Sequence, residues 1–184
     1  MSGSYETKRA LAEALKVIMR KTPFPRVKVE SVCEQACVSR RNFYRYFPDK
    51  YELLNWLYYD DFCAPLHEKN IQRSIDLIPY VCAHLYQDRA FFLNAFDVKG
   101  QNSFRDFCKG RLYGYLERDY GQAFSSKEVE RFYIEHILDA LFDGFQIWLR
   151  QEPCTPPEEF SNKLIRTLTR FSLRFAEVAR QEPR

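Results

Sequence analysis

The chain contains the stretch Val38-Ser39-Arg40-Arg41-Asn42-Phe43-Tyr44-Arg45-Tyr46-Phe47-Pro48-Asp49-Lys50. Ser39 can accept a hydrogen bond from a free amide in the first turn of a helix, and Pro48 cannot continue a helix. The stretch therefore predicts a helix of about eight residues, roughly 12 Å long. A helix of this size fits the major groove of DNA.

The two faces of this short helix differ in chemistry. Phe43 and Phe47 are four residues apart and share one face, which places Arg41, Tyr44 and Arg45 on the other. If the phenylalanines are buried, the basic face is free to meet nucleic acid. The simpler interpretation, an ordinary solvated basic face, is equally compatible with the charges alone.

The residues upstream favour the DNA interpretation. An amphipathic stretch from Val27 to Ala36 is separated from Ser39 by only Cys37 and Val38, and this spacing predicts a helix-turn-helix. A further helix is expected from Thr7 to Arg20. Three helices in about fifty residues can enclose one small core.

These residues resemble a known family. The run from Val29 to Ser39, then Phe43 to Phe47, then Asp49-Lys50-Tyr51-Glu52-Leu53-Leu54, is similar to the DNA-binding domain of the TetR family of bacterial transcriptional regulators, over roughly residues 7 to 60. The spacing Phe-Tyr-x-x-Phe-x-x-Lys-x-x-Leu-Leu spans two helices, which makes the resemblance specific. Arg40 to Tyr44, with Asn55-Trp56, further resembles the branch that includes regulators of dihydroxyacetone kinase operons.

The resemblance implies roles for individual residues. Arg40, Arg41 and Asn42 would read base edges, while Tyr44 and Tyr46 would contact phosphate or the groove wall. The complete set of expected DNA-binding residues is Lys28, Ser39, Arg40, Arg41, Asn42, Tyr44, Arg45, Tyr46 and Lys50. Lys50 would contact the DNA backbone from the first turn of the next helix.

Two positions depart from the family pattern. Cys37 stands where the family usually has a glycine in the turn, and a side chain at positive φ costs roughly 1 kcal/mol or more. Lys28 occupies the usual threonine cap of the second helix, where it adds a cation near phosphate instead.

Composition agrees with a DNA-binding protein. Of the 184 residues, the first 60 hold eleven Lys and Arg against seven Asp and Glu, whereas the remainder holds seventeen against eighteen. Neither a membrane span nor a signal peptide is expected, which predicts a cytoplasmic protein. The six cysteines form no Cys-x-x-Cys pair, so no metal site and no cofactor is expected. A redox or metal sensor at Cys33 and Cys37 is the less favoured alternative.

The sequence predicts an all-α fold. Residues 1–48 are expected to form the helix-turn-helix DNA-binding domain, and residues 49–184 a helical effector-binding and dimerisation domain. Further helices are predicted at about 69–87, with a break or bend at Pro79, at 88–98 and at 102–119.

Two long helices are expected to end the chain, and they resemble the family's dimerisation hairpin. The predicted interface residues are Ile137, Leu141, Phe145, Trp148, Leu164, Leu168, Phe171 and Phe175. A homodimer would read a pseudo-palindromic double-stranded operator through two recognition helices. The alternative is that both apolar stripes pack inward on a single protomer.

Many aromatic residues lie between Tyr80 and Trp148, where a family member often binds a small-molecule effector. The candidate pocket residues are His84, Phe92, Phe96, Phe107, Arg111, Tyr113 and His136. Plain core packing is the simpler explanation of these aromatics. A closed core would fit the alternative function, a TetR-like coactivator that is controlled by a partner protein without a small-molecule ligand.

An enzyme is the competing class of protein. The chain has three histidines, no glycine-rich phosphate loop and no nucleophile elbow, so it offers no catalytic constellation. A protein-interaction module that has lost DNA binding is a further alternative, and the retained Arg40, Arg41, Tyr44 and Lys50 argue against it. The main prediction is a TetR-like repressor whose operator binding responds to an effector.

Overall fold

The computed structural model describes residues 2–69, 71–100, 103–124 and 126–181, without the side chains of residues 2, 67–68 and 175–181. In chain order its elements are α1 (Ser2–Met19), η1 (Phe24–Arg26), α2 (Val29–Gln35), α3 (Arg40–Tyr46), α4 (Lys50–Tyr58), η2 (Tyr59–Cys63), α5 (Ala64–Glu68), η3 (Ser74–Asp76), α6 (Leu77–Gln87), α7 (Arg89–Phe96), α8 (Phe104–Tyr120), η4 (Gly121–Ala123), α9 (Lys127–Leu149) and α10 (Pro157–Gln181). These ranges contain helices and no strand, which confirms the predicted all-α class. None of the helices in them is both long and apolar enough to cross a membrane.

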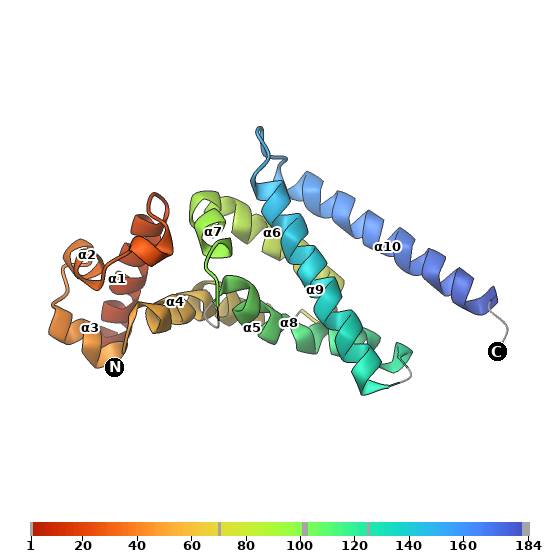
Figure 1. Ribbon diagram of the computed structural model, residues 1–184, viewed down its shortest axis with the longest axis horizontal. Coiled ribbons are helices and arrows are strands. Elements are labelled where there is room, and N and C mark those ends of the chain that lie inside the picture. Colours follow the sequence, from red (N-terminus) through yellow and green to blue (C-terminus); the bar gives the residue numbers. More distant parts are fainter. Residues whose placement is uncertain (1, 70, 101–102, 125, 182–184) are drawn as a thin grey trace.

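Helices α1, α2 and α3 lie together at one end of the molecule (Figure 1). Their shared core is apolar and fully buried, with Leu11, Leu15, Val32 and Phe43 each 0% exposed. Burying a side chain of this size stabilises a fold by about 1.5–3 kcal/mol, so these few residues can hold three short helices together. The predicted three-helix core is therefore present.

The turn between α2 and α3 is made by Cys37. Its φ is +53°, and its amide donates to the Glu34 carbonyl at 3.2 Å while the Val38 amide donates to the Cys33 carbonyl at 2.9 Å. This pair of hydrogen bonds is a Schellman motif, which glycine usually closes. Cys37 is thus a non-glycine residue in the left-handed conformation, and the turn tolerates its strain.

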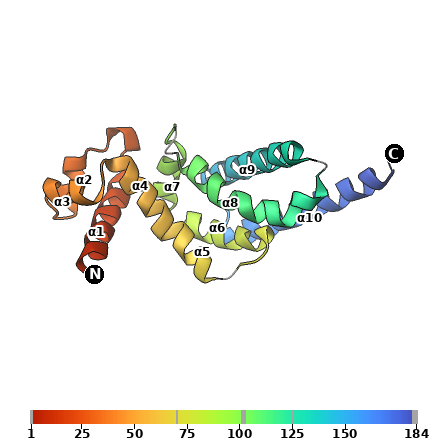
Figure 2. The same ribbon diagram turned by 90° about the horizontal axis from the view of Figure 1, so that it is seen from below.

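Helix α4 leads from this unit into the rest of the molecule (Figure 2). Asp49 caps it, because its carboxylate accepts from the amides of Tyr51 at 2.8 Å and Glu52 at 2.9 Å. The helix then widens into the π-helical turn η2 before continuing as α5. The sequence did not predict this π turn, since nothing in its apolar spacing departs from an ordinary helix.

The rear part of the molecule is built around aromatic rings. The buried rings that contact one another there are those of Tyr58, Phe62, Phe91, Phe92, Phe104 and Phe142. Helices α8 and α9 lie side by side, and α10 packs mainly on α6. Pro79 lies in the first turn of α6, where its missing amide costs no helical hydrogen bond, so the predicted break at Pro79 is wrong.

The last two helices diverge from the segment that joins them, and the far end of α10 extends past the other helices (Figure 1). Trp148 and Phe160 fix this joint, with parallel rings 4.3 Å apart, and the Trp148 indole donates to the Thr155 carbonyl at 2.8 Å. Because α10 packs on α6, α9 and α10 do not form a closed antiparallel hairpin within one protomer.

Candidate nucleic-acid interface

Helix α3, which the sequence predicts to be the recognition helix, has one buried face and one exposed face. Phe43 is 0% exposed and Phe47 is 3% exposed, whereas Tyr44 is 50% exposed and Arg41 and Arg45 lie on the surface. The Ser39 hydroxyl caps the helix by accepting from the Asn42 amide at 3.2 Å. Both predictions on which the DNA interpretation rests are confirmed: the buried phenylalanines and the serine cap.

Arg40 is held by its neighbours. Its guanidinium pairs with Glu30 of α2 at 2.9 Å, and a hydrogen bond with Tyr44, followed by the charge of Glu30, raises its pKa. Both members of the ion pair are largely exposed, so the pair orients Arg40 more than it stabilises the fold. The sequence analysis missed Glu30, because an acidic residue ten positions before the start of α3 gives little signal unless the turn brings it back to the helix.

The other predicted DNA-binding residues differ in the contacts that their side chains already make. The Arg45 guanidinium lies 4.7 Å from the centre of the Tyr46 ring and bonds its hydroxyl, which lowers the pKa of Tyr46. Arg41 is exposed and makes no hydrogen bond or ion pair within the part of the chain that the structure describes. Lys28 is exposed at the start of α2, and its side chain makes no capping hydrogen bond, as expected from the missing threonine.

Lys50 requires a correction. Its ammonium donates to three backbone carbonyls, those of Phe24 at 3.0 Å, Pro25 at 3.1 Å and Val27 at 2.8 Å. An ammonium group has three donors, and all three are used here. Burial lowers the pKa of Lys50. The geometry therefore makes Lys50 a clamp between α4 and the segment before α2, and does not support the predicted phosphate contact.

An open groove of about 390 Å³ lies beside the start of α3. Its lining residues are Glu30, Cys33, Glu34, Cys37, Val38, Ser39 and Arg40. Cys33 is buried, which raises the pKa of its thiol, and Cys37 is exposed. The described residues contain no group of three or more side chains suited to hold a metal ion.

The chain matches the family described as bacterial regulatory proteins, tetR family, over residues 10–57, and the family described as transcriptional regulator C-terminal region over residues 72–170. The second match alone covers more than half of the chain. This chain belongs to the TetR family of bacterial transcriptional regulators. It is therefore a DNA-binding transcription regulator and not an enzyme, as the sequence predicts.

Relatives agree with this assignment. Over 70 residues the chain is 29% identical to the HTH-type dhaKLM operon transcriptional activator DhaS of Lactococcus lactis subsp. lactis (strain IL1403), and this alignment spans 38% of the chain but only 37% of that relative. The fold is similar to the solved structure of the dihydroxyacetone kinase operon activator DhaS, with a TM-score of 0.64, 19% identity and coverage of 89% of this chain and 94% of that one.

A second similar structure belongs to a repressor. It is that of NalD, the secondary repressor of the MexAB-OprM multidrug efflux pump in Pseudomonas aeruginosa, with a TM-score of 0.63, 17% identity and coverage of 92% of this chain and 96% of that one. At these identities the similarity is one of fold. One of these two relatives activates and the other represses, so fold alone does not decide the sign of regulation.

The predicted effector residues of this TetR-family chain fall into two groups: four pack in the aromatic core and three lie elsewhere. His84 contacts the rings of Phe62, Tyr80 and Phe92, and Phe92 is buried in the aromatic core. Phe96 and Phe107 are partly buried at its edge. These four residues do lie together in or beside the aromatic core, but their rings pack against neighbouring rings.

The other three predicted pocket residues lie elsewhere. Arg111 is exposed over the rings of Tyr59 and Phe107, while Tyr113 packs against the smaller cluster of Leu116, Ile134 and Leu138. His136 is exposed, with its Nδ1 2.6 Å from the Phe132 carbonyl oxygen, so its prediction as a pocket residue is wrong. The cause is that His136 lies on the face of α9 that points away from the core.

A small cavity does occur among the rear helices. Its volume is about 50 Å³, and its lining residues are Ser74, Leu77, Ile78, Val81, Leu112, Leu116, Leu138, Leu141 and Phe145. None of the seven predicted effector residues lines it. The aromatic core nevertheless holds two buried polar atoms without a hydrogen-bond partner in the described residues, Tyr58 Oη and His84 Nε2. Such atoms cost stability unless a bound molecule satisfies them.

The predicted dimer residues separate into two groups. Phe145 is 4% exposed and Trp148 is 0% exposed, and both lie in the core of the protomer, as do the partly buried Leu141, Leu164 and Leu168 at its edge. Their prediction as interface residues is not supported, because they already have partners. The side chain of Phe175 lies outside those that the structure describes.

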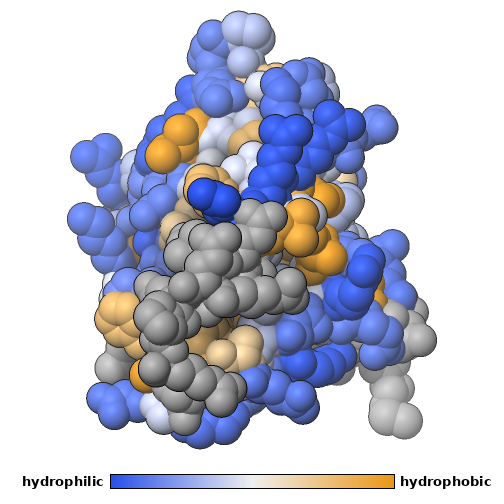
Figure 3. Space-filling view, turned by 90° about the vertical axis from the view of Figure 1, so that its right-hand side faces the viewer, coloured by the Kyte–Doolittle hydropathy of each residue, from blue (hydrophilic) through white to orange (hydrophobic). Residues whose placement is uncertain are grey.

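A second apolar stripe runs along the opposite face of α9. Its members recur at helical spacing and are Val129, Phe132, Tyr133, Ile137, Ala140, Gly144 and Ile147. Phe132 is 58% and Ile147 is 66% exposed, and on α10 Phe171 is 59% exposed. Figure 3, which faces the end of the molecule away from the helix-turn-helix, shows hydrophobic patches between hydrophilic side chains. Of the predicted residues, Ile137 and Phe171 are thus exposed.

Proposed function

We propose that this regulator acts in the cytoplasm as a homodimer that binds a pseudo-palindromic operator with its two α3 helices, and that it represses transcription until a small-molecule effector releases it. The observation that carries the proposal is the exposed face of α3. Arg41, Tyr44 and Arg45 point away from the buried Phe43 and Phe47, on a helix that Ser39 caps. Arginine at such a position suits bidentate contact with a guanine edge.

The exposed stripe on α9 supports the dimer. A row of large apolar side chains in water is unfavourable by about 25 cal/mol per Å² of apolar surface, and a second copy of the same stripe would cover it. A two-fold dimer would also double the base contacts that one short helix can make. Division of the chain near residue 48 into a DNA-binding part and a regulatory part belongs to the same proposal.

The orphaned Tyr58 hydroxyl and His84 Nε2 support control by an effector. Both are uncharged at neutral pH, since burial raises the pKa of Tyr58 and lowers the pKa of His84 to about 4. A small, largely aromatic molecule with one donor and one acceptor would satisfy them. Control by a partner protein is the second candidate, and the observation in its favour is that the cavity among the rear helices holds only about 50 Å³.

Selection of DNA from a random pool tests the function. We expect enrichment of an inverted repeat whose half-sites are about one helical turn apart. Enrichment of no sequence by the purified, folded chain would refute operator binding and favour an interaction module.

Substitution of Arg41 tests the assignment of the DNA face. Arg41→Ala is expected to weaken binding to the selected operator by about 1–3 kcal/mol and to relax one base preference, measured by fluorescence anisotropy on the operator and its single-base variants. The matched control is Arg73→Ala, because Arg73 is exposed directly before η3 and pairs with Asp76. Equal binding by both variants would contradict the assignment.

A further inference from the structure

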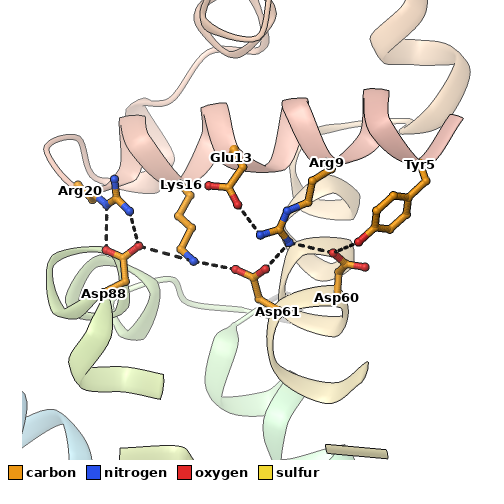
Figure 4. Close-up of polar contacts among 8 residues, drawn as sticks. All are labelled: Tyr5, Arg9, Glu13, Lys16, Arg20, Asp60, Asp61 and Asp88. Carbon is orange, nitrogen blue, oxygen red and sulfur yellow. Dashed lines mark hydrogen bonds and ion pairs between the residues drawn. The ribbon is translucent and has the colours of Figure 1, made fainter. Parts of the chain in front are cut away.

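A row of charged side chains joins the DNA-binding helices to the rear of the molecule (Figure 4). We name it the α1 ladder, and its members are Tyr5, Arg9, Glu13 and Lys16 on α1, Arg20 directly after α1, and Asp60, Asp61 and Asp88. Arg9 bonds Asp60 at 2.9 Å and also bonds Asp61, Lys16 bonds Asp61 at 2.7 Å, and Arg20 bonds Asp88 through two nitrogens at 2.9 and 2.7 Å. Tyr5 adds a hydrogen bond to Asp60 at 3.1 Å.

The acids of the α1 ladder are more buried than ordinary surface charges. The side chains of Asp61 and Asp88 are 11% and 10% exposed, and that of Lys16 is 13% exposed. Burial alone would raise the pKa of both carboxyl groups, but the hydrogen bonds and charges of Lys16, Arg9 and Arg20 lower it. Pairs in this environment are little screened by salt, and each has a strict geometry.

The carboxylates come from two different parts of the rear domain. Asp60 and Asp61 belong to the π turn η2, which continues α4, whereas Asp88 lies between α6 and α7. Lys16 contacts both parts, since its ammonium lies 2.7 Å from Asp61 and 3.6 Å from Asp88. The two parts therefore cannot move relative to each other without breaking a contact to α1.

The π turn also faces the aromatic core. Phe62 and Cys63 follow the two aspartates directly and are 2% and 3% exposed. The Phe62 ring lies 5.5 Å from the ring of His84, whose Nε2 is one of the two orphaned atoms. Single π turns inside α-helices are uncommon and often occur at functional sites. Because the three residues are consecutive in η2, a shift of the backbone at Phe62 would also move Asp60 and Asp61.

We propose that Asp61 and Asp88 are positioning residues that set the angle of the helix-turn-helix on the rear domain, and that repacking around Phe62 changes this angle through the π turn. The proposal rests on the proposed function in one respect: in a dimer, the angle of each α1 fixes the separation of the two α3 helices. Regulation would then depend on a fixed set of ion pairs, each of which is either formed or broken.

A distance measurement within one protomer tests the proposal without DNA. Probes are attached through keto amino acids at the exposed positions Gln35 on α2 and Gln87 on α6, and their separation is measured in the full chain. Asp61→Asn and Asp88→Asn are each expected to shift or broaden the distance distribution. The matched control is Asp139→Asn, because Asp139 also bridges two cations, Lys109 at 2.8 Å and Arg105 at 3.5 Å, but far from α1. It is expected to leave the distribution unchanged.

A second variant distinguishes a change in the angle from a loss of folding. Arg20→Gln removes the same pair as Asp88→Asn but leaves Asp88 bonded to Lys16, so it is the milder change. The shifts caused by Arg20→Gln and Asp88→Asn should not add in the double variant, because both break one pair. Additive shifts, or distributions identical to the parent, would overturn the proposal.

Operator binding gives the second readout. Asp61→Asn is expected to bind the parental operator at least about fivefold more weakly and to prefer a different half-site spacing, while retaining the same base preferences within a half-site. Unchanged affinity and unchanged spacing would overturn the proposal. If the parent selects no inverted repeat, the proposed function fails, but the distance measurement still decides whether the α1 ladder sets the angle.

Discussion

Cys37 holds the turn of the helix-turn-helix in a backbone conformation that L-residues rarely adopt. Its φ of +53° lies in the left-handed region, where a Cβ costs about 1 kcal/mol relative to glycine. Cys37→Gly is therefore expected to raise the free energy of unfolding by about 0.5–1 kcal/mol, less than the full strain because glycine also loosens the unfolded chain. Urea denaturation of both proteins measures this difference.

The control for this substitution is Cys37→Ala, which removes the thiol but keeps the Cβ. Alanine should give no gain in stability. If alanine and glycine stabilise equally, the thiol and not the backbone is the source of the strain. A gain in neither variant would mean that the entropy that glycine adds to the unfolded chain cancels the relief of strain.

His84 makes stability depend on pH. Burial lowers its pKa from 6.5 to about 4, with a smaller contribution from Lys16. Between pH 6.5 and 4 the unfolded chain binds a proton at this residue and the folded chain does not, so stability falls as pH falls through this window. The expected loss in the free energy of unfolding is about 3 kcal/mol. Urea denaturation at a series of pH values measures this loss.

The variant His84→Phe should flatten the pH dependence in that window. His136→Gln is the control, because His136 is exposed on α9. The depressed pKa values of Asp61 and Asp88 act at lower pH: their contribution is complete above the ordinary aspartate value of 3.8 and is lost as pH falls below it. An unchanged slope between pH 4 and 6.5 in His84→Phe would show that another group titrates there.

At the scale of the elements, α9 is apolar on two opposite faces. One face holds the buried Ile134, Leu138 and Phe142, and the other exposes Phe132 and Ile147. A helix with two apolar faces is typical of one that packs against two neighbours. The first neighbour is α8, and a second protomer is the proposed other.

Ile147→Glu should dissociate the proposed dimer, because it places a charge within the apolar stripe that the second protomer would cover. Ile147 is 66% exposed in the protomer, so the substitution should cost the protomer little stability. Sedimentation equilibrium measures the mass, with Gln87→Glu on the exposed side of α6 as control. A dimer that persists unchanged in Ile147→Glu would place the interface elsewhere.

At the scale of the whole molecule, positive charge gathers where DNA is expected. The first 60 residues carry a surplus of four basic residues, yet Arg9, Lys16 and Arg20 are paired in the α1 ladder and Lys50 is bonded to carbonyls. Arg41 and Arg45 on α3 and Lys28 at the start of α2 are exposed cations outside these contacts. Electrostatic attraction to phosphate should come from these few residues.

Binding should accordingly depend on salt in proportion to the number of helix-turn-helix units engaged. The slope of log affinity against log salt is about −0.9 for each phosphate neutralised, so Ile147→Glu is expected to show about half the slope of the parent. Anisotropy titrations on the operator across a range of KCl concentrations measure both slopes. Equal slopes would mean that a single protomer makes all the phosphate contacts.

The sequence by itself determined the helix-turn-helix. The Ser39 cap, the Pro48 stop and the four-residue spacing of Phe43 and Phe47 are local signals, and helical geometry converts them directly into a buried and an exposed face. The short turn between the two helices also follows from the sequence, but only the structure shows that Cys37 adopts the left-handed conformation there.

Only the tertiary structure decided which apolar and charged residues already have partners. Trp148 and Phe145 fit an interface pattern as well as Ile147 does, and the packing of α10 on α6 is what buries the first two. The family resemblance implies a phosphate contact for Lys50. In the structure its ammonium is instead bonded to three carbonyls of the segment before α2. Asp61 and Asp88 contact Lys16 across 45 and 72 residues of sequence. Helical periodicity carries no information over such separations, because these contacts depend on how the helices pack and not on the spacing of residues within one helix.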